Sequence, residues 1–357
     1  MQSSKKTFLS LVKLGIGNAD DALIPKNVDW KRLEDLAASQ GLSAIMVDGI
    51  EKLPEGIRPP KMLLLQWKGE TLQSYEYRYD LYKRTIAEMA AFYNHHGYRM
   101  MVLKGYSCSL EWPKPEHRPC GDIDIWMFGD YQKTDELLKS EKGIDVDDSH
   151  EHHTVFYWQD FMVENHYDFI DVHHRKSSPQ LESVFKDLGK DDTHWAELND
   201  TRVYLPSPNL HALFLLRHAM EHFASTEVTL RQLLDWAFFV RKHTKEIDWE
   251  WLIGVLEEYG MTPAFNLFNA ICVEDLGFEA SIFPPVQFLP GTKERVLNDI
   301  LDPEFSGMIP HRLLPRLLFK YKRWKANGWK NELCFKESMW SAFWSGVWGH
   351  IQKPKSL

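Results

Sequence analysis

Two segments in the middle of the chain, Met100–Leu103 and Gly121–Trp126, constrain the fold most, because each has the composition of a short β-strand. The second segment alternates aspartate with isoleucine, in the order Asp122-Ile-Asp124-Ile. Alternate side chains of a strand share a face, so we expect the isoleucines in a core and the two carboxylates together on the opposite face. Adjacent carboxylates repel each other unless a cation lies between them. The spacing therefore favours a divalent metal ion with oxygen ligands over the alternative, an exposed edge strand.

The chain on both sides of this region has the period of α-helices. Asp29 is expected to cap a helix that ends at Gly41. Apolar residues then recur at helical spacing from Lys61 to His96, and Gly69 is the place where that helix is open to interruption. The pattern resumes after residue 206, and the helices predicted there are Asn209–Phe223, Thr229–His243 and Asp248–Tyr259.

Between these helical regions the apolar period changes toward two. His153–Trp158 and Phe161–His166 are predicted to form a hairpin, and Phe169–His174 is predicted to extend its second strand. Thr201–Leu205 is predicted to be a further short strand. Strands interleaved with helices indicate an α/β or α+β core of modest size.

The bulk composition narrows the class of protein. A chain of 357 residues suits two or three packed units, which we place at residues 1–97 (helical), 98–205 (the core) and 206–357 (helical). The formal charge of −9 argues against a surface that coats extended nucleic acid. The four cysteines include no C-x-x-C pair, which fits a reducing, cytoplasmic setting. No stretch reaches the roughly 18 uncharged apolar residues of a membrane span.

The motifs around the acidic strand resemble a known family. Leu103-Lys104-Gly105, a proline-containing connection with Arg118, and then Asp122-x-Asp124 are similar to the uncharacterised nucleotidyltransferase family of the DNA polymerase β-type superfamily. The resemblance covers most of the chain. One departure is Gly105-Tyr106-Ser107, where the superfamily usually has Gly-Gly or Gly-Ser at the start of the helix. Further matches are Asp29-Trp30, the strand Val163–His166 and the stretch HFASTEVTLRQLLDW.

This resemblance implies an α+β fold with a small mixed-sheet nucleotidyltransferase core, flanked by N-terminal and C-terminal helical regions. It also implies that an NMP group passes from an NTP such as ATP to an acceptor hydroxyl, with Mg²⁺ or Mn²⁺. Asp122 and Asp124 would hold the metal ions, which neutralise charge that develops on the phosphoryl oxygens. Such sites need a third carboxylate from a neighbouring strand. Glu164 is favoured as this catalytic residue and metal ligand because Val-Glu-x-His matches the family, and Asp171 is the alternative.

Several other residues are candidates for contacts with the nucleotide. Gly105 lets the backbone approach a phosphate without a Cβ in the way. Lys104 or Arg118 would add a charged phosphate contact, and Ser107 belongs to the same candidate phosphate loop. On the C-terminal helices, the resemblance adds His222, Arg231 and Asp235 as candidates to line the cleft, with a polar seam between two helices as the alternative.

Histidines gather on both sides of the predicted hairpin. Three precede it and three follow it, namely His150, His152, His153, His166, His173 and His174. Contacts to a metal ion, a phosphate or a base are conceivable for them, whereas any single one is more often an ordinary surface residue.

Two other classes of function compete with nucleotidyl transfer. The run from His218 to His222 has the H-x-x-E-H pattern, in which two histidines bind zinc and the glutamate, here Glu221, is the base of a metallopeptidase. That interpretation leaves the Lys-Gly and Asp-x-Asp motifs without a role. The other class is a non-catalytic nucleotide-binding or interaction module. The sequence does not identify the acceptor, for which a small molecule, a sugar and a protein are candidates.

Overall fold

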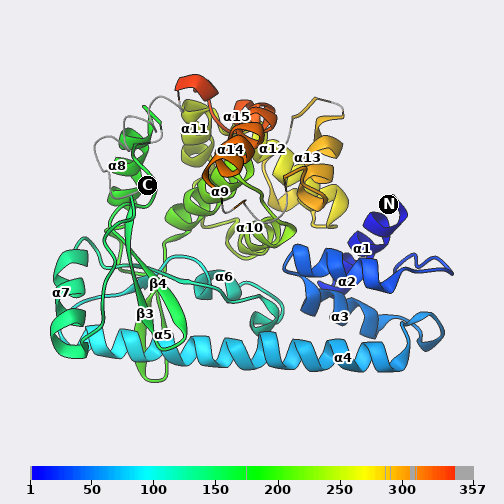
Figure 1. Ribbon diagram of the computed structural model, residues 1–357, viewed down its shortest axis with the longest axis horizontal. Coiled ribbons are helices and arrows are strands. Elements are labelled where there is room, and N and C mark those ends of the chain that lie inside the picture. The colour runs from blue at the N-terminus through cyan, green and yellow to red at the C-terminus, as the bar shows by residue number, and fades with distance from the viewer. Residues whose placement is uncertain are drawn as a thin grey trace.

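The computed structural model describes residues 2–173, 175–285, 287–289, 291–305, 310 and 312–341. A six-stranded mixed sheet in this part of the chain lies between one long helix and a layer of C-terminal helices (Figure 1). The fold is therefore α+β, as predicted. The strands are β1 (Met101–Val102), β2 (Ile123–Trp126), β3 (His153–Trp158), β4 (Phe161–His166), β5 (Trp195–Leu198) and β6 (Thr201–Tyr204). The helices are α1 (Gln2–Gly15), α2 (Trp30–Ser39), α3 (Ser43–Lys52), α4 (Lys61–Thr71), α5 (Arg78–His95), α6 (Tyr106–Ser109), α7 (Tyr131–Lys142), α8 (Ser178–Leu188), α9 (Pro208–Ser225), α10 (Leu230–His243), α11 (Trp249–Tyr259), α12 (Thr262–Ala270), α13 (Thr292–Leu301), α14 (Leu313–Ala326) and α15 (Gly328–Cys334).

The strand order of the sheet is β3-β4-β2-β1-β6-β5. The pairs β2–β4 and β1–β6 are parallel, and the remaining pairs are antiparallel. In the parallel β2–β4 pair, Asp124 lies directly opposite Glu164. In the antiparallel β3–β4 pair, His153 lies opposite His166. This register brings residues from three separate segments onto one face of the sheet.

The two faces of the sheet have different partners. Ile123 and Ile125 are fully buried and pack with Tyr82 and Met89 of α5, as the alternating pattern predicted. Trp126 belongs to the core on the other face, together with Phe214 of α9. Because side chains alternate along β2, the carboxylate of residue 124 points toward α9 rather than toward α5.

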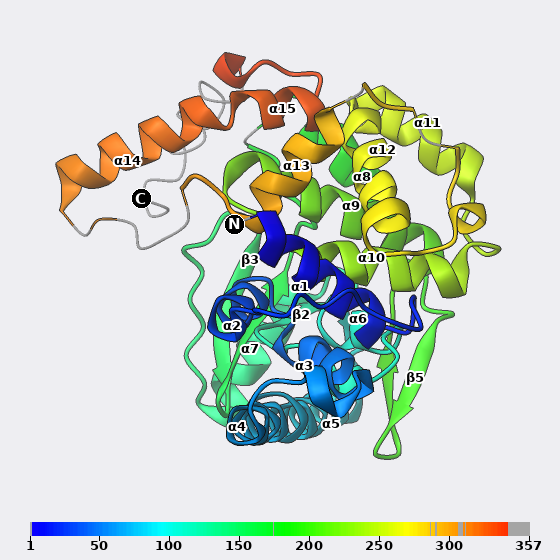
Figure 2. The same ribbon diagram turned by 90° about the vertical axis from the view of Figure 1, so that its right-hand side faces the viewer.

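The long helix under the sheet is continuous over residues 61–95. It consists of α4, a wider π-type segment at Leu72–Tyr77, and α5 (Figure 1). The irregularity therefore follows Gly69 by about one turn. Figure 2 shows α1, α2 and α3 gathered between this long helix and the C-terminal helices. Within the described residues, no helix has the length and apolar character needed to cross a membrane.

One strand prediction, the extension of the hairpin over Phe169–His174, was wrong, and one strand was missed. Phe169–Asp171 does not extend β4, because the N–H groups of Phe169 and Ile170 donate to the carboxylate of Glu182, at 3.0 Å each, instead of to a strand; His174 lies outside the described residues. The strand β5 was not predicted. It pairs with β6 through a two-residue turn at Asn199-Asp200, where both residues have positive φ angles of 50° and 58°. Such a turn favours Asn and Asp, so the signal was present.

Candidate active site

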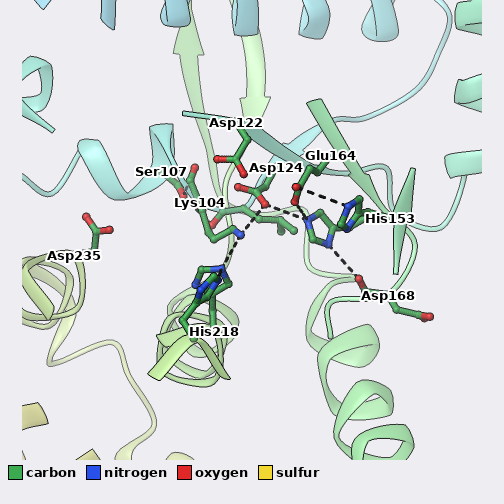
Figure 3. Close-up of polar contacts among 12 residues, drawn as sticks. Lys104, Ser107, Asp122, Asp124, His153, Glu164, Asp168, His218 and Asp235 are labelled. Carbon is green, nitrogen blue, oxygen red and sulfur yellow. Dashed lines mark hydrogen bonds and ion pairs between the residues drawn. The ribbon is translucent and has the colours of Figure 1, made fainter. Parts of the chain in front are cut away.

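A cluster of charged side chains lies where β2 and β4 run side by side. The Asp124 carboxylate is buried, and its Oδ1 lies 2.7 Å from the Nζ of Lys104, which follows β1 (Figure 3). Glu164 is next to Asp124 on the neighbouring strand because the parallel register pairs the two residues. Strand pairing thus places a carboxylate beside Asp124 on the neighbouring strand, where the third carboxylate was expected.

His166 links these two carboxylates. Its Nε2 lies 3.1 Å from Asp124 Oδ1 and 3.6 Å from Glu164 Oε2. Burial alone would lower the pKa of His166, but the hydrogen bond to Asp124 and the nearby carboxylate of Glu164 raise it to about 9. Burial would raise the pKa of Asp124, yet Lys104 and His166 hold it well below its usual range. Two cationic groups, Lys104 and His166, therefore stabilise the charged form of Asp124.

Lys104 connects the cluster to α9. Its Nζ donates to Nε2 of His218 at 3.1 Å (Figure 3), and this nitrogen lies 3.2 Å from Nε2 of His222. Burial and the neighbouring ammonium group hold the pKa of His218 well below its ordinary value, so its ring is neutral and accepts the hydrogen bond. For Lys104 itself, burial would lower the pKa, but Asp124 and Asp122 raise it.

Asp122 lies just before β2 and is partly exposed. Burial and the nearby charge of Asp124 raise its pKa. The potential ligand atoms of Asp124, Glu164 and His166 lie within 4.8 Å of one another, and in the described part of the chain Asp122 does not join that group. The structure thus gathers two of the three predicted metal ligands and adds His166, one of the six histidines for which the sequence left a metal contact open.

The cluster borders a cavity of about 730 Å³. Lys104, Asp122, Glu164 and Asp171 line it, together with residues of α9. A smaller cavity of about 160 Å³ adjoins the Lys-Gly segment, and its lining includes Lys104, Gly105, Arg118, Asp122, Asp124, His222, Arg231 and Asp235. Most of the predicted site residues therefore lie around two cavities, which share Lys104, Asp122 and His222 in their linings.

The model of the uncharacterised nucleotidyltransferase family matches residues 26–277, which is more than half of the chain. The chain belongs to this family. Among solved structures, it is similar to an antigenic nucleotidyltransferase-like protein from Paracoccidioides brasiliensis, with 14% sequence identity and a TM-score of 0.33 over 56% of this chain and 95% of that chain. A TM-score this low supports no further conclusion. No curated protein matches the chain.

In this family member, the Lys-Gly segment has a tight backbone for a reason that the sequence did not reveal. Gly105 has a φ of +58°, and a Cβ at this position would lie 2.0 Å from the hydroxyl oxygen of Tyr82. That hydroxyl donates to the main-chain oxygen of Asp122 at 2.9 Å. Glycine therefore lets Tyr82 fix the backbone just before β2.

Ser107 does not reach either cavity. Its side chain is buried, and its hydroxyl donates to the main-chain oxygen of Leu103 at 3.0 Å. The helix α6 that contains it has only four residues, so its hydroxyl is used within its own turn. The structure does not bring Ser107 to a place where it would contact a nucleotide.

Asp235 lies apart from the carboxylate cluster (Figure 3) and forms a buried pair with Arg118. The Nε and Nη2 of Arg118 donate to the two carboxylate oxygens of Asp235 at 2.7 and 2.9 Å, and Trp112 Nε1 donates to Oδ1 at 2.8 Å. Arg231, one helical turn before Asp235, lines the smaller cavity, as Arg118 does. Because two guanidinium nitrogens of Arg118 donate to Asp235, Arg231 is better placed than Arg118 to meet a phosphate.

The metallopeptidase pattern on α9 is arranged differently from a zinc site. Glu221 accepts a hydrogen bond from Arg217 at 2.6 Å. Among the described residues, the groups of three or more potential ligands are His152-His153-His166 and Asp124-Glu164-His166, and neither includes His218 or His222. His218 instead accepts from Lys104. The geometry thus assigns the α9 histidines to the carboxylate cluster.

Proposed function

We propose that the protein is a nucleotidyltransferase that uses Mg²⁺ or Mn²⁺ to move an NMP group from an NTP such as ATP to an acceptor hydroxyl. The observation that carries the proposal is the pairing of Asp124 with Glu164 in the β2–β4 register, beside a cavity lined by Lys104 and Asp122. Family membership supports the same class of reaction.

The residues present fit a divalent ion. Asp124 and Glu164 offer oxygen ligands, and His166 offers a nitrogen within 4.8 Å of them. Oxygen ligands suit Mg²⁺, and a mixed oxygen–nitrogen set also suits Mn²⁺. Asp122, Asp124 and Glu164 would hold the ion, whose chemistry is to neutralise charge on the phosphoryl oxygens.

The remaining steps fall to the side chains of the chain itself. The acceptor oxygen forms a bond to the α-phosphorus, the bond from that phosphorus to the bridging oxygen breaks, and pyrophosphate leaves. Glu164 accepts the proton of the hydroxyl. Lys104 and Arg231 line the smaller cavity and bind phosphate oxygens there. Asp171 lines the larger cavity and is the alternative third carboxylate.

The acceptor is a small molecule, a sugar or a protein, in a cytoplasmic setting. A cavity of about 730 Å³ is in the range of small-molecule sites, so it suits a mononucleotide with part of the acceptor. The formal charge of −9 disfavours extended nucleic acid as the acceptor.

The test is to incubate the purified protein with each α-labelled NTP, Mg²⁺ or Mn²⁺, and host lysate. We expect transfer of label to a lysate component, release of pyrophosphate, and loss of both with a chelator. The double variant Asp122→Asn/Asp124→Asn should reduce transfer to background because it removes two carboxylates of the site. Unchanged turnover in a folded double variant would overturn the proposal.

A further inference from the structure

One side of the 730 Å³ cavity is lined by carboxylates, and another side is lined by imidazole rings. His152 and His153 come at the start of β3, and His166 lies opposite His153 at the end of β4. The ring centroids of these three residues lie between 4.5 and 5.6 Å apart. All three line the 730 Å³ cavity, next to the carboxylates.

Two ring nitrogens on this side of the cavity have no use in the fold. The Nδ1 atoms of His152 and His153 are buried, and neither has a hydrogen-bond partner within the described part of the chain. A buried polar atom without a partner is unfavourable, and such atoms in native structures call for an explanation. Packing alone does not supply one, because an apolar ring would fill the same space without this cost.

The three imidazoles also meet a geometric condition for metal binding. One nitrogen from each of His152, His153 and His166 lies within 4.8 Å of the others. Glu164 stands beside them, with Oε1 3.8 Å from His153 Nε2 and Oε2 3.6 Å from His166 Nε2. Three imidazole nitrogens are the protein ligands of a zinc site whose fourth position stays open.

We propose that His152, His153 and His166 form a site for a transition-metal ion that prefers nitrogen ligands, of which Zn²⁺ is the representative. Mg²⁺ prefers oxygen ligands, which Asp122, Asp124 and Glu164 offer, so the carboxylates and the imidazoles differ in the ion that they select. Glu164 lies next to the imidazoles. The inference deepens the proposed function, on which it rests for what the ion does, but metal binding itself is measured independently of turnover.

The experiment uses full-length, tag-free protein from which metals have been removed by a chelator. Calorimetric titration with ZnCl₂ and, separately, with MgCl₂ gives both affinities, and Co²⁺ in place of Zn²⁺ gives a visible absorption spectrum that reports the ligands. We expect one Zn²⁺ per chain, bound at least 100-fold more tightly than Mg²⁺. The double variant His152→Gln/His153→Gln should lose at least 100-fold in Zn²⁺ affinity and lose the Co²⁺ spectrum.

The controls separate this site from its rivals. His95→Gln changes an exposed histidine of α5 and should bind Zn²⁺ as the parent does. Asp122→Asn should weaken Mg²⁺ binding and leave Zn²⁺ binding unchanged. Melting curves of the metal-free variants check folding, and a Zn²⁺-induced rise in melting temperature should appear in the parent but not in His152→Gln/His153→Gln.

Three outcomes would overturn the inference. One is a parent protein that binds no Zn²⁺. The second is a folded double histidine variant with unaltered Zn²⁺ affinity. The third is loss of Zn²⁺ on His218→Gln with retention in the double variant, which would place zinc at the peptidase pattern of α9. Failure of the proposed function looks different, because Zn²⁺ binding would then persist without NTP turnover under any metal condition.

Discussion

Two buried ion pairs involve the segment from residue 104 to residue 124, and they differ in how completely each charge is matched. At Arg118 and Asp235, both carboxylate oxygens accept from one guanidinium, and an indole N–H adds a third bond. At Asp124, Lys104 and His166 both approach the same oxygen, while the carboxylates of Asp122 and Glu164 remain close to the cavity. We call the first pair closed because both oxygens of its carboxylate are hydrogen-bonded. Around the second pair, three carboxylates face only two cationic groups within the described residues.

The difference teaches how to tell a structural ion pair from a functional one. A fully satisfied buried pair needs no further partner, so its role is to fix α10 against the segment before β2. An excess of carboxylate at the edge of a cavity is stabilised when a cation binds there, and perturbed groups of this kind gather at functional sites. Changes to the two pairs should therefore affect different properties.

The largest effect on stability is expected from opening the closed pair. Asp235→Ala leaves the Arg118 guanidinium buried without a counter-ion, which should lower the free energy of unfolding by about 3–5 kcal/mol. Asp124→Ala should cost less than half of this because Asp122 and Glu164 stay near Lys104. Urea denaturation of both variants measures the two losses. Equal losses would abolish the distinction between the pairs.

A second comparison separates the two candidates for the third carboxylate. Glu164→Gln should lower turnover by about 10²–10⁴-fold, the size expected when a general base is lost. Asp171→Asn should lower it by less than about 10-fold, since Asp171 lines the cavity outside the strand register. Steady-state rates with the labelled NTP decide the matter. A larger loss for Asp171→Asn would transfer the role to that residue.

The smallest effect concerns Glu182, a buried carboxylate that accepts from N–H groups of Phe169 and Ile170. Burial raises its pKa from 4.5 to about 7 in the folded protein. The folded state therefore holds this proton at pH values where the unfolded chain releases it, and stability should fall as pH rises from about 4.5 to 7. Glu182→Gln should lose this pH dependence. Melting temperatures of both proteins at pH 5 and pH 7 test it, and parallel pH trends would contradict it.

Local patterns in the sequence predicted the parts of the site that depend on one segment. Period-two alternation placed the isoleucines of β2 in the core and turned Asp124 to the other face, and helical periodicity located α9, α10 and α11. Glu164 was preferred from a local motif, and the strand register then placed it beside Asp124.

The remaining contacts join residues that are far apart in the sequence. A local apolar pattern does not predict which helix packs against which part of the sheet. Lys104 meets His218 across more than a hundred residues. Arg118, rather than the helical neighbour Arg231, pairs with Asp235, because a buried bidentate contact from a distant loop outweighs a weak pair one turn away. Ser107 was misplaced because a hydroxyl in a short helix has its own carbonyl groups within reach.

The β2–β4 register has a consequence for how activity is acquired during folding. A shift of β4 by one residue would turn every side chain of that strand to the opposite face. Glu164 and His166 would then enter the apolar layer against α5, and Val163 and Asn165 would face the cavity. The correct pairing of β4 with β2 therefore brings Glu164 and His166 to the cavity together, and a misaligned strand removes both. A chain with this strand misaligned is expected to have no residual activity, so a preparation of intermediate activity would be a mixture of competent and incompetent molecules.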